Sequence, residues 1–246
     1  MTVLIVGGVA LSFFLVERLA PGREWQRVPG WLWRVVGLNA VQIGVVFAAG
    51  TLWDGWMLRH RPWSADALGT IGGAVAGYLA ITFVYYFWHR ARHTQPFLWR
   101  WLHQVHHSPS RLEVVASFYK HPLEIAANGL LSSAVLYLVV GLDAPTAALV
   151  VAATGVAELF YHWNVKTPYW LGFLFQRPES HCVHHELGRH ASNYSDLPIW
   201  DMLFGTFHNP RDFAGRCGFE GDAEQRLGEM LLGRDVSHPR STGVSA

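Results

Sequence analysis

The chain has 246 residues, of which 51% are hydrophobic and 15% are charged. Soluble domains carry about 25% charged residues, so this composition favours a membrane protein. The formal net charge is +1 and no basic run is interleaved with aromatic residues, so there is no reason to expect nucleic acid as a partner. The two cysteines, Cys182 and Cys217, are too few for a disulfide framework and fit a reducing compartment.

Apolar stretches occupy residues 2–16, 35–53, 67–88, 125–142 and 145–163. A helix needs about 20 residues to cross a bilayer, so the second and third stretches are predicted to span it. The first is short. It lacks a basic leader and a clear small-residue cleavage site, so we interpret it as a retained membrane helix and not a signal peptide. The last two stretches are predicted to form a tight helical hairpin, with Gly141 ending one helix and Pro145 starting the next.

Arginine positions predict the orientation in the membrane. The segment between the first two stretches carries Arg18, Arg23, Arg27 and Arg34. Positively charged loops favour the cytoplasm, so this segment is placed there. With that orientation every histidine cluster lies on the cytoplasmic face, although Arg59 and Arg61 then lie outside. Residues 94–120 are expected to lie along the membrane surface as short helices. The basic residues are nearly all arginine, which is typical of a GC-rich bacterial genome, so we expect the bacterial inner membrane rather than the endoplasmic reticulum.

The 14 histidines are unevenly spread, with six in residues 89–121 and four in residues 181–190. His89 and His93 are four residues apart, so on a helix both rings project from one face. The pattern His-x-x-His-His occurs twice, as His103, His106 and His107 and as His181, His184 and His185. On a helix, the adjacent pair of each triad diverges by about 100°, so its members can face different ions. These candidate ligands are too many for one ion, which takes about four to six, so the pattern indicates two metal ions.

Further motifs accompany these histidines. In chain order the segments are Tyr86-Phe-Trp-His89-Arg-Ala-Arg-His93, Trp101-Leu-His103-Gln-Val-His106-His107-Ser108, Lys120-His121-Pro-Leu-Glu124, His162-Trp-Asn164, His181-Cys-Val-His184-His185, Asn193-Tyr194 and Trp200-Asp201-Met-Leu-Phe-Gly205-Thr206. Over residues 67–208 this order resembles the fatty acid hydroxylase / sterol desaturase superfamily of membrane di-iron enzymes.

The resemblance implies an all-α fold: a polytopic membrane helical bundle of about four to five transmembrane helices, capped by a cytosolic helical layer that holds a di-metal centre. Residues 1–208 are predicted to form this single membrane-embedded domain. Residues 209–246 are predicted to form a polar C-terminal tail that is partly disordered, above all in its last ten residues.

The resemblance also implies metal binding by His89, His93, His103, His106, His107, His162, His181, His184 and His185. His121 is either a ligand or a partner of one. Asn164 either orients a ligand or a metal-bound water, or forms a hydrogen bond at a helix end. Carboxylates usually fix the rings at such sites, and the candidates are Glu124, Glu158, Glu186, Asp196 and Asp201.

Other residues are assigned less direct roles. Tyr194 and Trp200 are expected either to line the substrate path or to pack in the core. Cys182 should point away from the metals and be inert. The remaining histidines fall outside the motifs and are predicted to be surface residues: His60, His190, His208 and His238.

The resemblance implies two iron ions, with zinc possible in purified material, and O₂ as co-substrate. The predicted reaction hydroxylates or desaturates a C–H bond of a lipid that enters from the bilayer, whether sterol-like, fatty acyl or ether lipid. The sequence contains no cytochrome b5-like His-Pro-Gly-Gly segment, so we expect a separate electron donor of reductase, cytochrome b5 or ferredoxin type.

Three alternatives stay open at this point. A membrane haem protein for electron transfer needs ligands spaced along two spans, whereas these histidines lie in tight triplets. A zinc protein with a structural or hydrolytic site is the second, although His-Glu-x-x-His is absent. A metal transporter is the third, but its ligands should line the spans and not cap them.

Overall fold

A computed structural model describes residues 2–238, and their regular structure is helical apart from one isolated bridge between Glu186 and Cys217. The α-helices are α1 (Thr2–Leu19), α2 (Trp31–Ala49), α3 (Gly55–Arg59), α4 (Gly69–Thr94), α5 (Pro96–Leu98), α6 (Gln104–His107), α7 (Pro122–Ser133), α8 (Ala144–Tyr161), α9 (Pro178–His184), α10 (Pro198–Leu203) and α11 (Leu227–Leu231). Shorter 3₁₀ and π-helical segments are η1 (Gly50–Asp54), η2 (Asp66–Leu68), η3 (Trp99–His103), η4 (Val114–Ala116), η5 (Ala134–Val140), η6 (Tyr169–Phe173) and η7 (Ala223–Gln225). The predicted all-α fold is confirmed.

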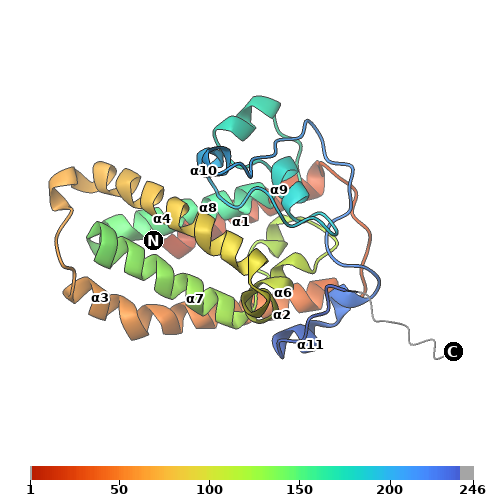
Figure 1. Cartoon of the computed structure of the whole chain (residues 1–246), viewed down its shortest axis with the longest axis horizontal. Helices are drawn as coiled ribbons and strands as arrows, with labels where there is room; N and C mark the ends of the chain where they lie inside the picture. Colours follow the sequence, from red (N-terminus) through yellow and green to blue (C-terminus); the bar gives the residue numbers. More distant parts are fainter. Residues whose placement is uncertain (1, 239–246) are drawn as a thin grey trace.

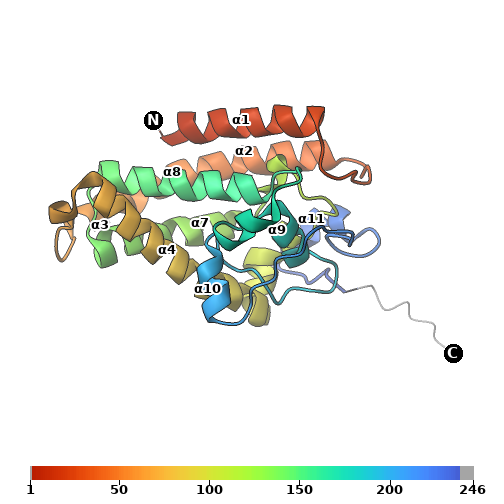
Figure 2. The same ribbon diagram turned by 90° about the horizontal axis from the view of Figure 1, so that it is seen from above.

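Within the described residues, four helical segments are long and apolar enough to cross a membrane: Trp31–Arg59, Asp66–Thr94, Pro122–Val139 and Ala144–Tyr161. They coincide with the second to fifth apolar stretches of the sequence. Helix α4 packs against α8, α2 against α7, and α1 along α8 (Figures 1 and 2). The chain therefore forms the predicted membrane helical bundle.

The outer surface of this bundle is apolar. Leu52 is 74% exposed and Ile71 is 77% exposed, and many large apolar side chains of α2, α4 and α7 also face outward. Monomeric soluble proteins rarely expose apolar surface on this scale, whereas lipid chains cover it without cost.

The hairpin between η5 and α8 follows the sequence prediction. Gly141 adopts a left-handed conformation with φ 80°, which ends the preceding helix. The Asp143 side chain accepts a hydrogen bond of 2.7 Å from the backbone N–H of Thr146 and so caps α8, with Pro145 in its first turn.

The short helices that follow α4 and α8 gather at one end of the bundle, whereas the short helix α3 lies at the other end (Figure 1). Helix α4 runs past its apolar part to Thr94, and Gln95 is extended because Pro96 follows it. The short helices α5, η3 and α6 come next, as expected for residues 94–120. Helices α9, α10 and α11 join them, so this end forms the expected helical cap.

The C-terminal segment is more closely integrated than a polar tail. Met230 and Val236 are fully buried in the same core cluster as Val105. The Gln104 side chain donates a hydrogen bond of 2.8 Å to the Arg234 carbonyl and accepts one of 3.2 Å from the Val236 N–H. Residues after 208 therefore complete the helical cap as far as Val236. Most of the stretch predicted to be disordered, residues 239–246, lies outside the described residues.

Candidate metal centre

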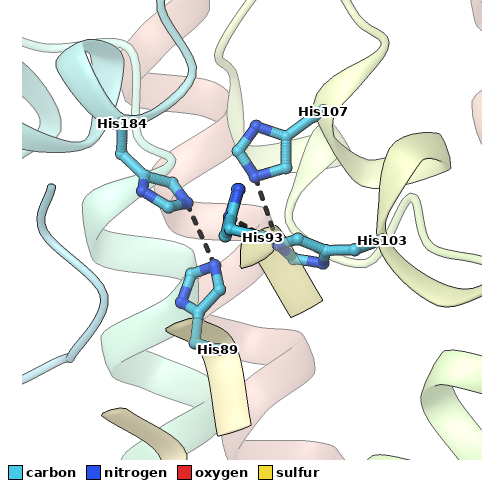
Figure 3. Close-up of side chains that lie close together, drawn as sticks. All are labelled: His89, His93, His103, His107 and His184. Carbon is cyan, nitrogen blue, oxygen red and sulfur yellow. Dashed lines mark hydrogen bonds between the residues drawn. The ribbon is translucent and has the colours of Figure 1, made fainter. Parts of the chain in front are cut away.

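Five histidines converge at the end of α4, with one ring nitrogen of each within 4.8 Å of the others: His89, His93, His103, His107 and His184. Their rings point toward a common centre (Figure 3). The Nε2–Nε2 distances are 3.0 Å for His89 and His184, 3.1 Å for His93 and His103, and 3.2 Å for His103 and His107. We call this set the five-histidine group.

Four further histidines form a second group by the same criterion: His106, His162, His181 and His185. All four are buried. Nε2 of His181 lies 3.2 Å from Nε2 of His162 and 3.1 Å from Nε2 of His185. We call this set the four-histidine group. The two groups adjoin, because the rings of His107 and His185 stack with centroids 4.1 Å apart.

Each His-x-x-His-His triad contributes to both groups. His106 and His107 are neighbours in sequence, yet their ring planes differ by 88° and they belong to different groups. His184 and His185 diverge in the same way, with 77° between their planes. The predicted divergence of each adjacent pair is confirmed.

The geometry fits a metal ion in each group. At metal–nitrogen distances of about 2.0–2.1 Å, neighbouring ligands of a tetrahedral or octahedral ion are separated by about 2.9–3.4 Å. The observed Nε2–Nε2 distances of 3.0–3.2 Å fall in that range. Without an ion, converging nitrogen lone pairs repel one another. The residues present therefore suit two metal ions bound through Nε2.

Burial keeps these rings neutral, which is the form that binds metals. Burial first, and repulsion from neighbouring imidazole groups second, hold the pKa of His107 and the pKa of His181 well below the usual value. Burial also lowers the pKa of His162 and His184 to about 3, although each receives partial compensation from a backbone carbonyl.

Backbone carbonyls orient several rings. Nδ1 of His89 donates a hydrogen bond of 2.8 Å to the Tyr194 carbonyl, and Nδ1 of His184 donates one of 2.7 Å to the Ser192 carbonyl. Nδ1 of His162 donates to the Glu158 carbonyl at 2.8 Å. Each bond places the proton on Nδ1 and leaves the Nε2 lone pair directed at the group.

Glu124 takes the place that was predicted for a carboxylate behind a ligand. It is fully buried, and its Oε1 accepts a hydrogen bond of 2.9 Å from Nδ1 of His103. Arg92, buried between His89 and His93 in α4, donates to the same oxygen. The sequence analysis did not identify Arg92, although its position within the His-x₃-His motif placed it beside the ligands.

Asp201 acts through the backbone. Its carboxylate accepts hydrogen bonds from the N–H groups of Tyr194 (2.8 Å) and Ser195 (3.0 Å). It therefore holds the loop whose carbonyl orients His89. Gln176 is a further residue that the sequence analysis missed, with its side-chain amide 2.7 Å from Nδ1 of His181.

The structure does not place His121 or Asn164 at either group. His121 precedes Pro122 and caps α7, its Nδ1 accepting a hydrogen bond of 3.0 Å from the Leu123 N–H. The Asn164 side chain pairs with the backbone of Arg23, at 3.0 Å to its N–H and 2.9 Å to its carbonyl. Neither of the two roles predicted for His121, ligand or partner of a ligand, is observed, and Asn164 connects the segment after α8 to Arg23 instead of orienting a ligand.

The prediction that His190 is a surface residue is wrong. Its ring lies 5.0 Å from that of His107 and 5.2 Å from that of Trp99, and it stacks on His93 at 5.7 Å. His190 therefore packs against the five-histidine group from outside. Among the other histidines set aside as surface residues, His60 and His238 are exposed and His208 is partly exposed.

The remaining expectations divide. Tyr194 packs its ring edge-on against His89 and lines a cavity, and its place on a substrate path stays a prediction. Trp200 instead donates to Thr82 Oγ1 at 3.0 Å and packs edge-on against Phe83, which is a core role. Cys182 is buried in a separate apolar cluster, as expected of an inert thiol.

A cavity of about 320 Å³ joins both groups to the interior of the bundle. His89 and His103 border it from one group, and His106 and His181 from the other. Its walls come from α2, α4, α7 and α8, and on α7 it reaches Ser133, about 16 Å along the helix from the capped end. Both candidate metal positions therefore face a long cavity within the membrane-spanning helices.

Comparison with known proteins places this geometry in a family. A family model for fatty acid hydroxylase matches residues 74–206. An ornithine lipid hydroxylase of Rhizobium tropici is 31% identical over 212 residues, which cover 80% of this chain and 63% of that protein. A very-long-chain aldehyde decarbonylase of Oryza sativa is 33% identical over 55% of this chain and 54% of that protein. An alkylglycerol monooxygenase of Homo sapiens is 29% identical over 63% of this chain and 34% of that protein.

The chain thus spans less than two thirds of the length of each of these three relatives. No solved structure matches it. The family model nevertheless covers more than half of the chain and includes both histidine groups, so the chain belongs to the fatty acid hydroxylase family.

Proposed function

We propose that this chain is an integral-membrane oxygenase that uses two iron ions and O₂ to hydroxylate a carbon of a lipid. The observation that carries the proposal is that two all-histidine groups adjoin one another and border a single cavity inside the membrane bundle. The overall reaction consumes the lipid C–H bond, O₂, two electrons and two protons, and yields the alcohol and water. Bound iron would supply the redox chemistry, which zinc cannot do.

The chain's own residues hold and shield that chemistry. The rings of the two groups would hold both ions where they border the cavity, and burial of these rings excludes bulk water. Hydrogen bonds to the Tyr194 carbonyl and to Glu124 keep the Nε2 atoms of His89 and His103 free for metal. Electrons would come from a separate donor of reductase, cytochrome b5 or ferredoxin type, on the cytoplasmic face of a bacterial inner membrane.

The cavity supports a lipid substrate. Val46 of α2 and Val151 of α8 both line it, and their side chains are 56% and 43% exposed. The cavity therefore has a mouth on the lipid-facing flank, through which a chain enters sideways from the bilayer.

Hydroxylation is favoured over desaturation by the relatives. Those described above include a lipid hydroxylase and a monooxygenase. A sphingolipid C4-hydroxylase of Schizosaccharomyces pombe is also 26% identical over 51% of the chain. We therefore propose a polar membrane lipid, in which the oxidised carbon becomes an alcohol.

The haem alternative fits the geometry poorly. A haem iron takes two axial ligands from opposite faces of a macrocycle. Here four or five imidazoles converge on one point with nitrogens about 3 Å apart, which leaves no plane for a macrocycle.

The test begins with the full chain purified in nanodiscs and loaded anaerobically with ferrous iron. We expect about two irons per chain, and after addition of O₂ and a reduced ferredoxin system, a lipid from a bacterial extract should gain 16 mass units. Zinc-loaded protein and the His106→Ala/His107→Ala variant are the controls and should give no product. A loss of 2 mass units would replace hydroxylation by desaturation, and no mass change in any lipid would contradict the proposal.

A further inference from the structure

Asp196 is a carboxylate of the cavity wall that forms no ion pair with a cationic side chain in the part of the chain that the structure describes. Both cations in this wall are already paired, because Arg92 bonds Glu124 and Lys120 bonds Glu158. The Asp196 carboxylate therefore has no direct cationic partner in the described residues, although Lys120 lies close enough to lower its pKa.

Asp196 is held firmly beside the histidines. Its carbonyl accepts a hydrogen bond of 3.0 Å from the backbone N–H of Gln176. It belongs to the loop whose carbonyls at Ser192 and Tyr194 orient His184 and His89. These bonds fix the backbone of Asp196, and the hydrogen bond with the Tyr161 hydroxyl orients its carboxylate.

Several aromatic residues line the cavity that Asp196 borders. The Tyr161 hydroxyl forms a hydrogen bond with Asp196, and Tyr85, Tyr194 and Phe118 line the same cavity. Aromatic faces beside a carboxylate form a favourable site for an ammonium group. Burial, and then repulsion from Glu158, raise the pKa of Asp196 to about 7, and a bound cation would relieve that cost.

We propose that the lipid substrate carries an amine in its polar part and that Asp196 binds the resulting ammonium group inside the cavity. This inference rests on the proposed function, because it names the class of lipid that the same cavity takes. Neutral lipids with the same chains would lack the charge that Asp196 requires and would bind more weakly.

Binding of two matched probes tests the inference without turnover. Hexadecylamine and N-acetylhexadecylamine share a chain, but only the first is cationic at pH 7.5. Their affinities are measured on the metal-loaded full chain in nanodiscs under anaerobic conditions, by competition with a fluorescent lipid. Empty nanodiscs of the same composition correct for partition into the bilayer. We expect the amine to bind about tenfold more tightly, as one charge-assisted hydrogen bond allows.

Variants then assign the preference to one residue. Asp196→Asn should remove the amine preference while leaving affinity for the acetylated probe and metal content unchanged, and Asp196→Glu should keep the preference. Asp54→Asn is the matched control, because Asp54 is another cavity carboxylate without an ion pair in the described residues, bonded to Ser133.

Several outcomes would overturn the inference. Equal affinity of the wild-type protein for both probes would overturn it, and this result does not depend on whether Asp196→Asn folds. Loss of the preference in Asp54→Asn alone would move the site to Asp54. A lower metal content in Asp196→Asn, with both probes weakened equally, would show instead that Asp196 balances the charge of the metals. Failure of the proposed function would appear separately, as bound probe without any oxidised lipid.

Discussion

Nδ1 of His103 donates a hydrogen bond of 2.9 Å to Oε1 of Glu124, a carboxylate with no exposed surface. The carboxylate fixes the proton of the ring on Nδ1 and raises the basicity of Nε2, the atom that faces the five-histidine group. It is the only carboxylate that contacts a ring nitrogen of either group in the described residues, since the other orienting bonds go to carbonyls or to an amide.

Replacement Glu124→Gln should therefore weaken metal binding at the five-histidine group. We expect a loss of about 10- to 100-fold in affinity there, because the neutral amide no longer stabilises the oriented ring. Metal titration followed by mass spectrometric metal analysis measures this. Glu220→Gln, at an exposed position in the same end of the molecule, is the control and should leave both affinities unchanged. Equal weakening of both groups would contradict this role.

Neighbouring histidines should affect different metals. His106 belongs to the four-histidine group and His107 to the five-histidine group. Each single replacement by alanine should reduce bound metal from about two ions per chain toward one, because each removes one ligand from one group only. Cobalt substitution gives each site its own absorption bands, so the two variants should lose different bands. Loss of the same bands in both would show that the rings share one site.

Helical periodicity allowed much of this centre to be predicted. The rotation of about 100° per residue holds through α6 and α9, so the spacing alone separated His106 from His107 and His184 from His185. The same rule placed His89 and His93 on one face of α4. The four long apolar stretches likewise became the membrane helices, because composition determines which segments a bilayer accepts.

Features that depend on loops and local capping were beyond sequence reasoning. His190 follows Gly188, whose φ of 74° turns the chain back toward the rings, and no periodicity reports such a turn. His121 resembled a ligand by its motif, but Pro122 at the start of α7 makes it the capping residue. Val236 is an isolated apolar residue in a polar stretch, so its burial could not be read from a pattern, whereas Leu227, Met230 and Leu231 have the spacing of a short helix that the sequence analysis did not use.

His190 gives a prediction of its own. Its ring stacks on His93 and contacts Trp99 and His107. It therefore holds the rings of candidate ligands in place without being a ligand itself. Replacement His190→Ala should speed metal loss from the five-histidine group roughly two- to tenfold, the effect of about 0.5–1.5 kcal/mol of aromatic packing. Metal release to a chelator measures it. His60→Ala, at an exposed ring, is the control, and an unchanged release rate for His190→Ala would refute the supporting role.

The mouth of the cavity can be closed without touching the histidines. Val46 lines the cavity and is also 56% exposed, whereas Val41 is 50% exposed on the same helix, α2, but does not line it. Replacement Val46→Trp should raise KM for the lipid about tenfold, equivalent to about 1.4 kcal/mol of lost binding, and leave metal content unchanged. Val41→Trp, which adds the same indole beside the mouth but outside it, should leave KM unchanged. Similar values for the two variants would mean that lipid reaches the histidines by another route, because Val46, unlike Val41, lines the cavity that leads to the metal centre.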